Sequence, residues 1–276
     1  MVKLVAYLGP IGTFTEAAAL LYDPNAELLA FPSISTVASA VDSRITDEGI
    51  VPIENSLEGS VTDTLDLLIH ESNLSICHEM VIPIEHCILV KPGSSMSDVT
   101  YIYSHPQALG QCRRFIEKYF SGAQAVASLS TASAVEDMMK SKSSAVAIAN
   151  SRAAEIYGAE ILARGVQDSS VNHTRFVVLA HHDHPQTGND KTSLCFSFDA
   201  DRSGMLYSAL GHFASRNINL AKVESRPNKE SLGQYIFWVD LDGHREDTSV
   251  REALNSIKSE VSMMKIFGSY PHYKDI

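Results

Sequence analysis

Short β-forming runs that end in a glycine or polar turn and lead into a helix start recur over the first 180 residues of the chain. Val2–Leu8 is the first such run, and the alanine- and leucine-rich stretch Phe14–Tyr22 follows its Gly-Pro turn. Gly49–Ile53 leads in the same way into Val61–Ile69, where apolar residues have helical spacing. Strands that alternate with helices favour a mostly parallel sheet, because parallel strands need a crossover connection. This region is therefore predicted to be an α/β unit.

The alternation continues as far as residue 180. We expect strands at Met80–Val90, Val99–Tyr103, Ala145–Ala149 and Phe176–Leu179, and helices at Ala108–Phe120, Ser133–Lys140 and Ser151–Tyr157. Gly158 directly follows the last of these helices, at the position where glycine commonly ends a helix. In the first helix, Thr13 or Thr15 is expected to be the N-cap.

The polar segment 181–190 contains proline and glycine and is predicted to be a linker between two differently patterned regions. After it we expect strand, helix, strand, strand, helix and strand, at Thr192–Phe198, Met205–Arg216, Ile218–Ser225, Tyr235–Leu241, Ser249–Val261 and Met264–Ser269. This βαββαβ order is that of the ferredoxin-like α+β fold. A two-layer unit of roughly 80 residues buries limited surface on its own, so we expect a homodimer or homotetramer.

Charge and cysteine content exclude several classes of protein. Lysine and arginine number 22 against 33 aspartates and glutamates, and the resulting net charge of −11 disfavours a nucleic-acid partner. The apolar N-terminal run is too short for a signal peptide or a membrane span. The four cysteines lack CxxC spacing, which indicates reduced, buried thiols and a cytoplasmic protein. The linker histidines have no second ligand cluster nearby, so no metal is predicted.

Three polar stretches lie where an expected strand gives way to a loop, the position at which open α/β sheets bind ligands. Gly9–Phe14 offers backbone N–H groups at a helix start, which favours an anion, although a glycine turn before a helix is more often purely structural. Asn55 and Ser56 follow a buried strand, although capping of the next helix would explain part of this turn. Arg175 has the planar fork that binds a carboxylate, yet an arginine at a strand edge is more often a surface charge. His105 is open to the same two interpretations.

Together these stretches resemble the prephenate dehydratase family over nearly the whole chain. The motifs that carry the resemblance are Gly9–Phe14, Pro52–Ser56 with Gly59 and Val61, Ser104–Ala108 and Asn172–Phe176. In the second region, Glu224-Ser225-Arg226-Pro227 resembles the effector motif of the family's ACT domain. One departure is visible: the usual Gly-Ala-Leu reads Gly204-Met205-Leu206 here, and the bulkier residue is expected to alter effector affinity or selectivity.

The resemblance implies a bilobed catalytic domain at 1–180, similar to type II periplasmic binding proteins. Lobe one is expected at 1–77 and 165–180, lobe two at 78–164, and the ACT domain at 191–276 after the linker. The resemblance implies that the catalytic residues are Thr174, Arg175 and Phe176. It implies that the substrate-binding residues are Thr13, Phe14, Asn55, Ser56, Gly59, Ser104, His105, Gln107 and Ala108.

The implied activity is that of a lyase of phenylalanine biosynthesis, the loss of water and CO2 from prephenate to give phenylpyruvate. It needs no cofactor, because the ring becomes aromatic. Thr174 would assist departure of the hydroxyl and Arg175 would bind a carboxylate. A threonine hydroxyl is a very weak acid, so the proton reservoir is left open among Glu54, Glu58, His105, His173 and water.

The ACT domain implies allosteric regulation by phenylalanine. The residues implied for that site are Gly204, Met205, Leu206, Asn217, Glu224, Ser225, Arg226 and Pro227. Two other functions fit the same pattern: an arogenate dehydratase, and a non-catalytic amino-acid-sensing protein. Because the dehydratase pattern begins at Lys3, an additional chorismate mutase segment is not expected.

Overall fold

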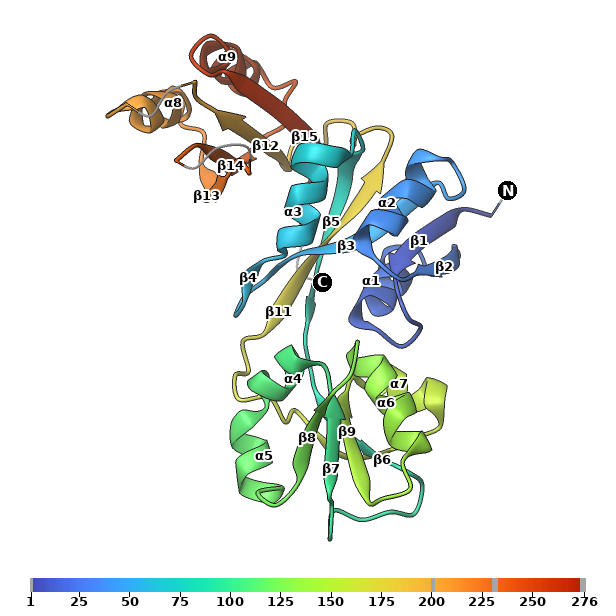
Figure 1. Cartoon of the computed structure of the whole chain (residues 1–276). Helices are drawn as coiled ribbons and strands as arrows, with labels where there is room; N and C mark the ends of the chain where they lie inside the picture. Colours follow the sequence, from blue (N-terminus) through green and yellow to red (C-terminus); the bar gives the residue numbers. More distant parts are fainter. Residues whose placement is uncertain (1, 200–201, 230–232, 274–276) are drawn as a thin grey trace. The chain divides into compact units, whose positions relative to one another are not determined.

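The computed structural model describes residues 2–199, 202–229 and 233–273, and the chain folds as two compact units. Unit 1 comprises Met1–Thr62 and Met80–Phe176, and unit 2 comprises Asp63–Glu79 and Val177–Ile276. The described residues form three sheets, coloured along the chain in Figure 1. The segment Asp63–Glu79 groups with unit 2, whereas the sequence led us to expect residues 63–77 in lobe one and 78–79 in lobe two.

The first sheet has the order β2-β1-β3-β11-β5, with β4 paired to β3. β1 runs parallel to β2 and to β3, whereas β4 is antiparallel to β3. Helices α1 and α2 pack against its N-terminal strands. The elements are β1 (Leu4–Leu8), α1 (Phe14–Tyr22), β2 (Glu27–Phe31), α2 (Ile34–Asp42), β3 (Glu48–Asn55), β4 (Gly59–Ser60), β5 (Ser75–Pro83) and β11 (His173–Ala180).

The second sheet lies in unit 1 and has the order β10-β6-β9-β7-β8. Every residue of its central strand β9 is buried, with α6 and α7 packed on one face and α4 and α5 on the other. The elements are β6 (Cys87–Val90), β7 (Tyr101–Ser104), α4 (Pro106–Gln111), α5 (Arg113–Tyr119), β8 (Gln124–Ala127), α6 (Thr131–Lys140), β9 (Ala145–Ala149), α7 (Ser151–Tyr157) and β10 (Glu160–Arg164). Two strand pairs are parallel and two antiparallel, so the expectation of a mostly parallel sheet is wrong here.

Two expected elements of unit 1 are interrupted. The apolar run Met80–Val90 is two strands, because the chain leaves the first sheet after Pro83 and joins the second at Cys87. The expected helix Ala108–Phe120 ends at Cys112 and restarts as α5. The Asp168 carboxylate accepts a hydrogen bond from the Arg114 N–H at this break, which satisfies a first-turn donor.

A third expected helix, Val61–Ile69, changes its winding. It begins as α3 (Thr62–Asp66) and continues as a π-helical turn, η1 (Leu67–Glu71). The Lys265 ammonium donates hydrogen bonds to the carbonyl oxygens of Leu68 and Ser72, both at 2.7 Å, within unit 2. These bonds satisfy carbonyl groups that the end of a helix leaves without a partner.

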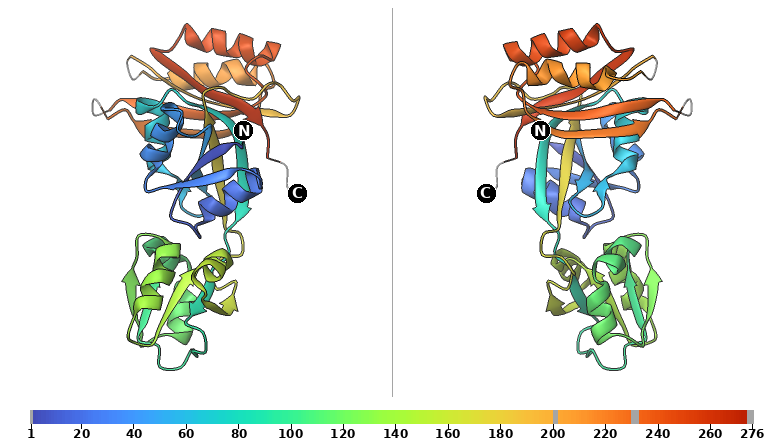
Figure 2. Two further views of the ribbon diagram at one scale, coloured as in Figure 1. Left: turned by 90° about the vertical axis from the view of Figure 1, so that its right-hand side faces the viewer. Right: turned by 90° about the vertical axis from the view of Figure 1, so that its left-hand side faces the viewer.

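The third sheet belongs to unit 2 and confirms the predicted βαββαβ order. Its strand order is β13-β14-β12-β15, and α8 and α9 lie together on one face (Figure 2). The elements are β12 (Asp190–Ser197), α8 (Met205–Ala214), β13 (Leu220–Pro227), β14 (Tyr235–Asp242), α9 (Thr248–Lys258) and β15 (Met263–Pro271). All four cysteines are buried and free. Among the described residues, no helix has both the length and the apolar character that crossing a membrane requires.

Candidate active site

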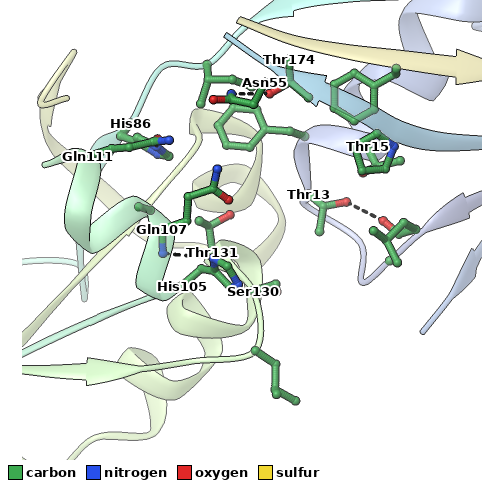
Figure 3. Close-up of a pocket in the computed structure, with 18 of the residues that line it drawn as sticks. Thr13, Thr15, Asn55, His86, His105, Gln107, Gln111, Ser130, Thr131 and Thr174 are labelled. Carbon is green, nitrogen blue, oxygen red and sulfur yellow. Dashed lines mark hydrogen bonds between the residues drawn. The ribbon is translucent and has the colours of Figure 1, made fainter. Parts of the chain in front are cut away.

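A pocket of about 300 Å³ opens in unit 1 where loops of its two sheets face one another. Most of the predicted substrate-binding residues lie around it, together with others (Figure 3). The lining residues are Leu8, Gly9, Thr13, Phe14, Thr15, Pro32, Pro52, Asn55, Ile84, His86, His105, Gln107, Ala108, Gln111, Leu129, Ser130, Thr131, Thr174 and Phe176. No lysine, arginine, aspartate or glutamate is among these described lining residues. Any anion in the pocket must therefore be held by neutral donors.

Three helices begin at the pocket wall: α1, α4 and α6. Their N-caps are Thr13, His105 and Ser130, and each side chain accepts a hydrogen bond from a backbone N–H of its own first turn. The remaining first-turn N–H groups have no partner within the helix, and the helix dipole makes that end positive. The pocket therefore offers donor groups for an anion without any fixed positive charge.

Thr174 is held in a fixed orientation by amide side chains. Asn55 Nδ2 lies 2.9 Å from Thr174 Oγ1, 2.9 Å from Asn172 Oδ1 and 3.1 Å from the His173 carbonyl oxygen, so its two hydrogens are shared among three acceptors. Asn172 Nδ2 in turn donates to Gln111 Oε1 at 2.9 Å. Because the Thr174 oxygen accepts from Asn55, its own O–H is available to donate into the pocket.

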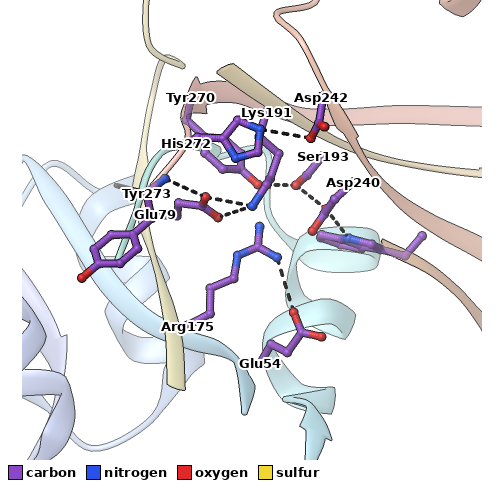
Figure 4. Close-up of polar contacts among 11 residues, drawn as sticks. Glu54, Glu79, Arg175, Lys191, Ser193, Asp240, Asp242, Tyr270, His272 and Tyr273 are labelled. Atoms are coloured by element: carbon purple, nitrogen blue, oxygen red, sulfur yellow. Dashed lines mark hydrogen bonds and ion pairs between the residues drawn. The ribbon is translucent and has the colours of Figure 1, made fainter. Parts of the chain in front are cut away.

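Arg175 lies away from the pocket. Successive side chains of a strand point to opposite faces, so Thr174 and Phe176 reach the pocket from β11 and the residue between them does not. Instead, Arg175 Nη1 is 3.5 Å from Glu54 Oε2 (Figure 4). The structure thus does not bring Arg175 to the position of a carboxylate clamp.

Three other predicted binding residues are also not among the lining residues. Ser104 is fully buried, and its hydroxyl donates to the Ile148 carbonyl oxygen at 2.7 Å. Ser56 donates to the Val171 carbonyl and accepts from the His173 N–H, so it ties two loops together. Gly59 lies in the exposed strand β4. Thr13, Phe14, Asn55, His105, Gln107 and Ala108 do line the pocket.

Several lining residues were missed from the sequence, among them His86, Gln111, Ser130 and Thr131. Three of these four residues could have been found from a sequence pattern. Gln111 lies one helical turn after Gln107 on the same helix face. Ser130 and Thr131 have the sequence of an N-cap after a strand, as in the other two stretches. No sequence pattern indicated His86, because it lies inside the apolar run Met80–Val90, which was predicted to be a single strand.

The candidates for a proton reservoir are differently placed. Burial lowers the pKa of His105, and its Nδ1 accepts from the Gln107 N–H at 3.3 Å, which leaves the proton on Nε2. Glu58 lies outside the lining residues, with Oε1 3.5 Å from Gln111 Nε2. Glu54 pairs with Arg175, and His173 does not line the pocket. His105 is thus the only one of these four side chains among the lining residues.

A second, smaller pocket of about 180 Å³ lies in unit 2. Gly204, Met205 and Leu206 line it with aromatic side chains, among them Phe198 and Phe237. The predicted effector residues of β13 and Asn217 are not among its lining residues. They lie elsewhere in unit 2, where Arg226 Nη2 binds Asp66 Oδ1 at 2.9 Å.

Comparison with known proteins identifies relatives along the whole chain. A family model described as Prephenate dehydratase matches residues 5–184, and one described as ACT domain matches residues 200–259. The chain is 43% identical to a bifunctional chorismate mutase/prephenate dehydratase of Aquifex aeolicus, over 97% of this chain and 73% of the relative. It is 37% identical to a prephenate dehydratase of Methanocaldococcus jannaschii, over 98% of this chain and 99% of the relative.

A solved structure gives the same result. The crystal structure of prephenate dehydratase from Arthrobacter aurescens in complex with L-Phe superposes with a TM-score of 0.88 at 34% identity. It covers 98% of this chain and 90% of the other. Sequence and fold therefore agree over both units.

Proposed function

Because the chain belongs to the prephenate dehydratase family, with a C-terminal ACT domain, we propose that it is a carbon–oxygen lyase that converts prephenate to phenylpyruvate. The observation that carries this proposal is the orientation of Thr174. Its oxygen accepts from Asn55 Nδ2 at 2.9 Å and lies at a pocket lined by neutral donors, so its O–H is free to donate to a bound substrate. Such a group is matched to a leaving hydroxyl on an anionic substrate.

The reaction removes the ring hydroxyl as water and the ring carboxylate as CO2, and consumes one proton. Thr174 donates a hydrogen bond to the departing oxygen, which lowers the charge that develops on it. The electron pair of the breaking carbon–carboxylate bond enters the ring and completes its aromatic system. Because a threonine hydroxyl is too weak an acid to be the ultimate proton source, the consumed proton comes from solvent, either directly through water or through the pocket residue His105 once its ring has taken up a second proton.

The two carboxylates of the substrate are held by the helix N-termini. Helices α1 and α6 begin at the pocket wall, since their N-caps Thr13 and Ser130 are lining residues, and their first-turn N–H groups are the proposed donors. Gln107 and Gln111 add amide donors from α4. A site of this kind releases the ring carboxylate as neutral CO2 more readily than an arginine clamp would, because it stabilises the charged ground state less.

The direct test is to measure phenylpyruvate formation from prephenate and phenylalanine formation from arogenate with the same purified protein. We expect kcat/KM to be at least about tenfold higher for prephenate, since none of the described residues that line the pocket is acidic and could pair with the arogenate ammonium. A higher kcat/KM for arogenate would reassign the substrate, and the absence of both products would favour the amino-acid-sensing alternative.

Regulation by phenylalanine is proposed to act through unit 2, which contains Gly204–Leu206 and the Glu224–Pro227 strand. Arg226 binds Asp66 on α3 within this unit, and Lys229 Nζ lies 2.6 Å from the same carboxylate. α3 follows the Asn55–Ser60 turn in the chain, and Asn55 orients Thr174. An effector that changes the position of β13 therefore acts on helix α3, which directly follows the Asn55–Ser60 turn in the sequence.

We predict that Asp66→Asn weakens the response to L-phenylalanine and leaves basal activity unchanged. The ratio of rates with and without L-phenylalanine should fall about three- to tenfold, while kcat/KM without effector stays within about twofold. Glu246→Gln, which removes an exposed carboxylate 3.8 Å from Arg245 in the same unit, is the matched control. A full effector response in Asp66→Asn would exclude this route.

We further propose the domain assignment 1–180, 181–190 and 191–276, a homodimer or homotetramer, and a cytoplasmic location. The four buried free thiols support a reducing compartment. Light scattering of the purified protein, with and without L-phenylalanine, measures the oligomeric state.

A further inference from the structure

His86 is the last residue of a series of hydrogen-bonded side chains, Asn55, Asn172 and Gln111, that begins at Thr174. We call this series the amide network. His86 is 2% exposed, lines the pocket, and its ring meets Phe14 edge to face at a centroid distance of 5.7 Å. Its backbone is fixed on both sides, because its N–H donates to Gln167 Oε1 and its carbonyl accepts from the Val166 N–H. Its Nε2 lies 3.0 Å from Gln111 Oε1.

Two backbone N–H groups determine which side-chain atoms of the amide network donate and which accept hydrogen bonds. The N–H groups of Leu57 and Glu58 both point at Asn55 Oδ1, at 3.0 and 3.1 Å. A backbone N–H can only donate, so this oxygen must be the carbonyl and Nδ2 must be the amino group of Asn55. The orientation of the Asn55 amide is therefore determined by the fold.

The donor and acceptor atoms of Asn172, Gln111 and His86 follow from the orientation of Asn55. Asn55 Nδ2 donates to Asn172, so the atom of Asn172 that it contacts is the carbonyl oxygen. Asn172 must then use its amino group on Gln111, which makes the contacted atom of Gln111 its carbonyl oxygen. That oxygen can only accept, so His86 must carry its proton on Nε2. Figure 3 shows His86 and Gln111 side by side on the pocket wall.

The other ring nitrogen of His86 is unusual. Nδ1 is buried and has no hydrogen-bond partner among the described residues. A buried polar atom without a partner costs free energy, and an apolar side chain of similar size would avoid that cost. Burial lowers the pKa of His86, although the hydrogen bond to Gln111 opposes this. A second proton on Nδ1 would add a buried charge without a partner, so the neutral form is favoured.

From this geometry we infer that His86 is a positioning residue, whose neutral Nε2–H form fixes the amide of Gln111 and, through Asn172 and Asn55, keeps Thr174 as a hydrogen-bond donor toward the substrate. The consequence for Thr174 rests on the proposed function. The protonation of His86 does not, because it follows from the hydrogen bonds alone.

The first experiment is therefore independent of activity. The full chain labelled with [15N]histidine is examined by two-bond 15N–1H correlation spectra, and His86 is identified among the 11 histidines by its loss in His86→Gln. We expect a bare Nδ1 and a protonated Nε2, unchanged as the pH falls through 6.5, the ordinary pKa of histidine. A proton on Nδ1, or titration at or above pH 6.5, would overturn the inference.

The second experiment uses turnover of prephenate. His86→Leu removes the donor and should lower kcat on the order of 10- to 100-fold with a smaller change in KM, because misplacement of a reacting group reduces turnover. His86→Gln places an amide N–H near Nε2 and should recover kcat to within about threefold of the parent. His86→Asn lacks a donor at that reach and should resemble the leucine variant.

The control is His244→Gln, which alters another buried histidine in unit 2. It should change thermal stability but not kcat. If His86→Leu and His86→Gln have the same kcat while both remain folded by circular dichroism, the positioning role is wrong. If His86 has the expected Nε2 proton but no variant makes phenylpyruvate and neither does the parent chain, the proposed function is wrong instead.

Discussion

Replacing Thr174 by alanine is expected to lower kcat for prephenate by about 10²- to 10⁴-fold while KM changes by less than about threefold. The hydroxyl donates only weakly to the ground-state hydroxyl of the substrate, and more strongly once that oxygen takes up negative charge. Its loss therefore raises the barrier without removing the donors that hold the carboxylates. Steady-state rates of phenylpyruvate formation separate kcat from KM.

Thr174→Ser is the matched control, because it keeps the hydroxyl and removes only a methyl group. It should retain at least about a tenth of kcat, since a serine oxygen can still accept from Asn55 while donating to the substrate. Thr174→Val keeps the shape of the side chain and should behave like alanine. Full turnover in Thr174→Val would show that the hydroxyl has no part in the reaction.

The sequence allowed the motifs of the site to be identified but not the direction of each side chain. Thr174 and Arg175 are adjacent in the same motif, and the motif does not indicate which of the two side chains points into the site. The alternation of β11 separates them, since only the even-numbered positions 174 and 176 face the pocket. The period of two separates the two side chains but does not indicate which of them faces the pocket, because Phe176–Ala180 are all buried and show no alternation.

Contacts between residues far apart in the sequence could not be predicted, for a different reason. His86 lies between two strands that form parts of different sheets, and its partner Gln111 is 25 residues away. Nothing in the apolar run Met80–Val90 indicates where the chain changes sheets. In the same way, the π-helical turn Leu67–Glu71 depends on hydrogen bonds from Lys265, almost 200 residues later. Short periodic segments such as Ser151–Tyr157, by contrast, were predicted to the residue, because Asn150 and Gly158 fix both ends locally.

The close contact between β15 and the segment Asp63–Glu79 leads to the prediction with the largest effect on stability. Gly268 has φ +146°, and a Cβ added there would lie 2.2 Å from the Ile76 carbonyl oxygen. The register of β15 against β12 shifts between Ser193 and Leu194, so the strand bulges at this point. Gly268 thus permits the backbones of β15 and β5 to meet within unit 2.

Gly268→Ala should lower the free energy of unfolding by about 3–5 kcal/mol, combining a strained backbone with an overlap that only a backbone shift can relieve. The melting temperature should fall on the order of 10 °C in thermal denaturation followed by circular dichroism. Gly211→Ala is the matched control, because Gly211 lies inside α8 with no atom within 4 Å of an added Cβ. That change should be neutral or stabilising by up to about 1 kcal/mol, since alanine favours a helix. Equal melting temperatures for the two variants would mean that Ile76 and Gly268 do not meet in solution, and that Asp63–Glu79 does not belong to unit 2.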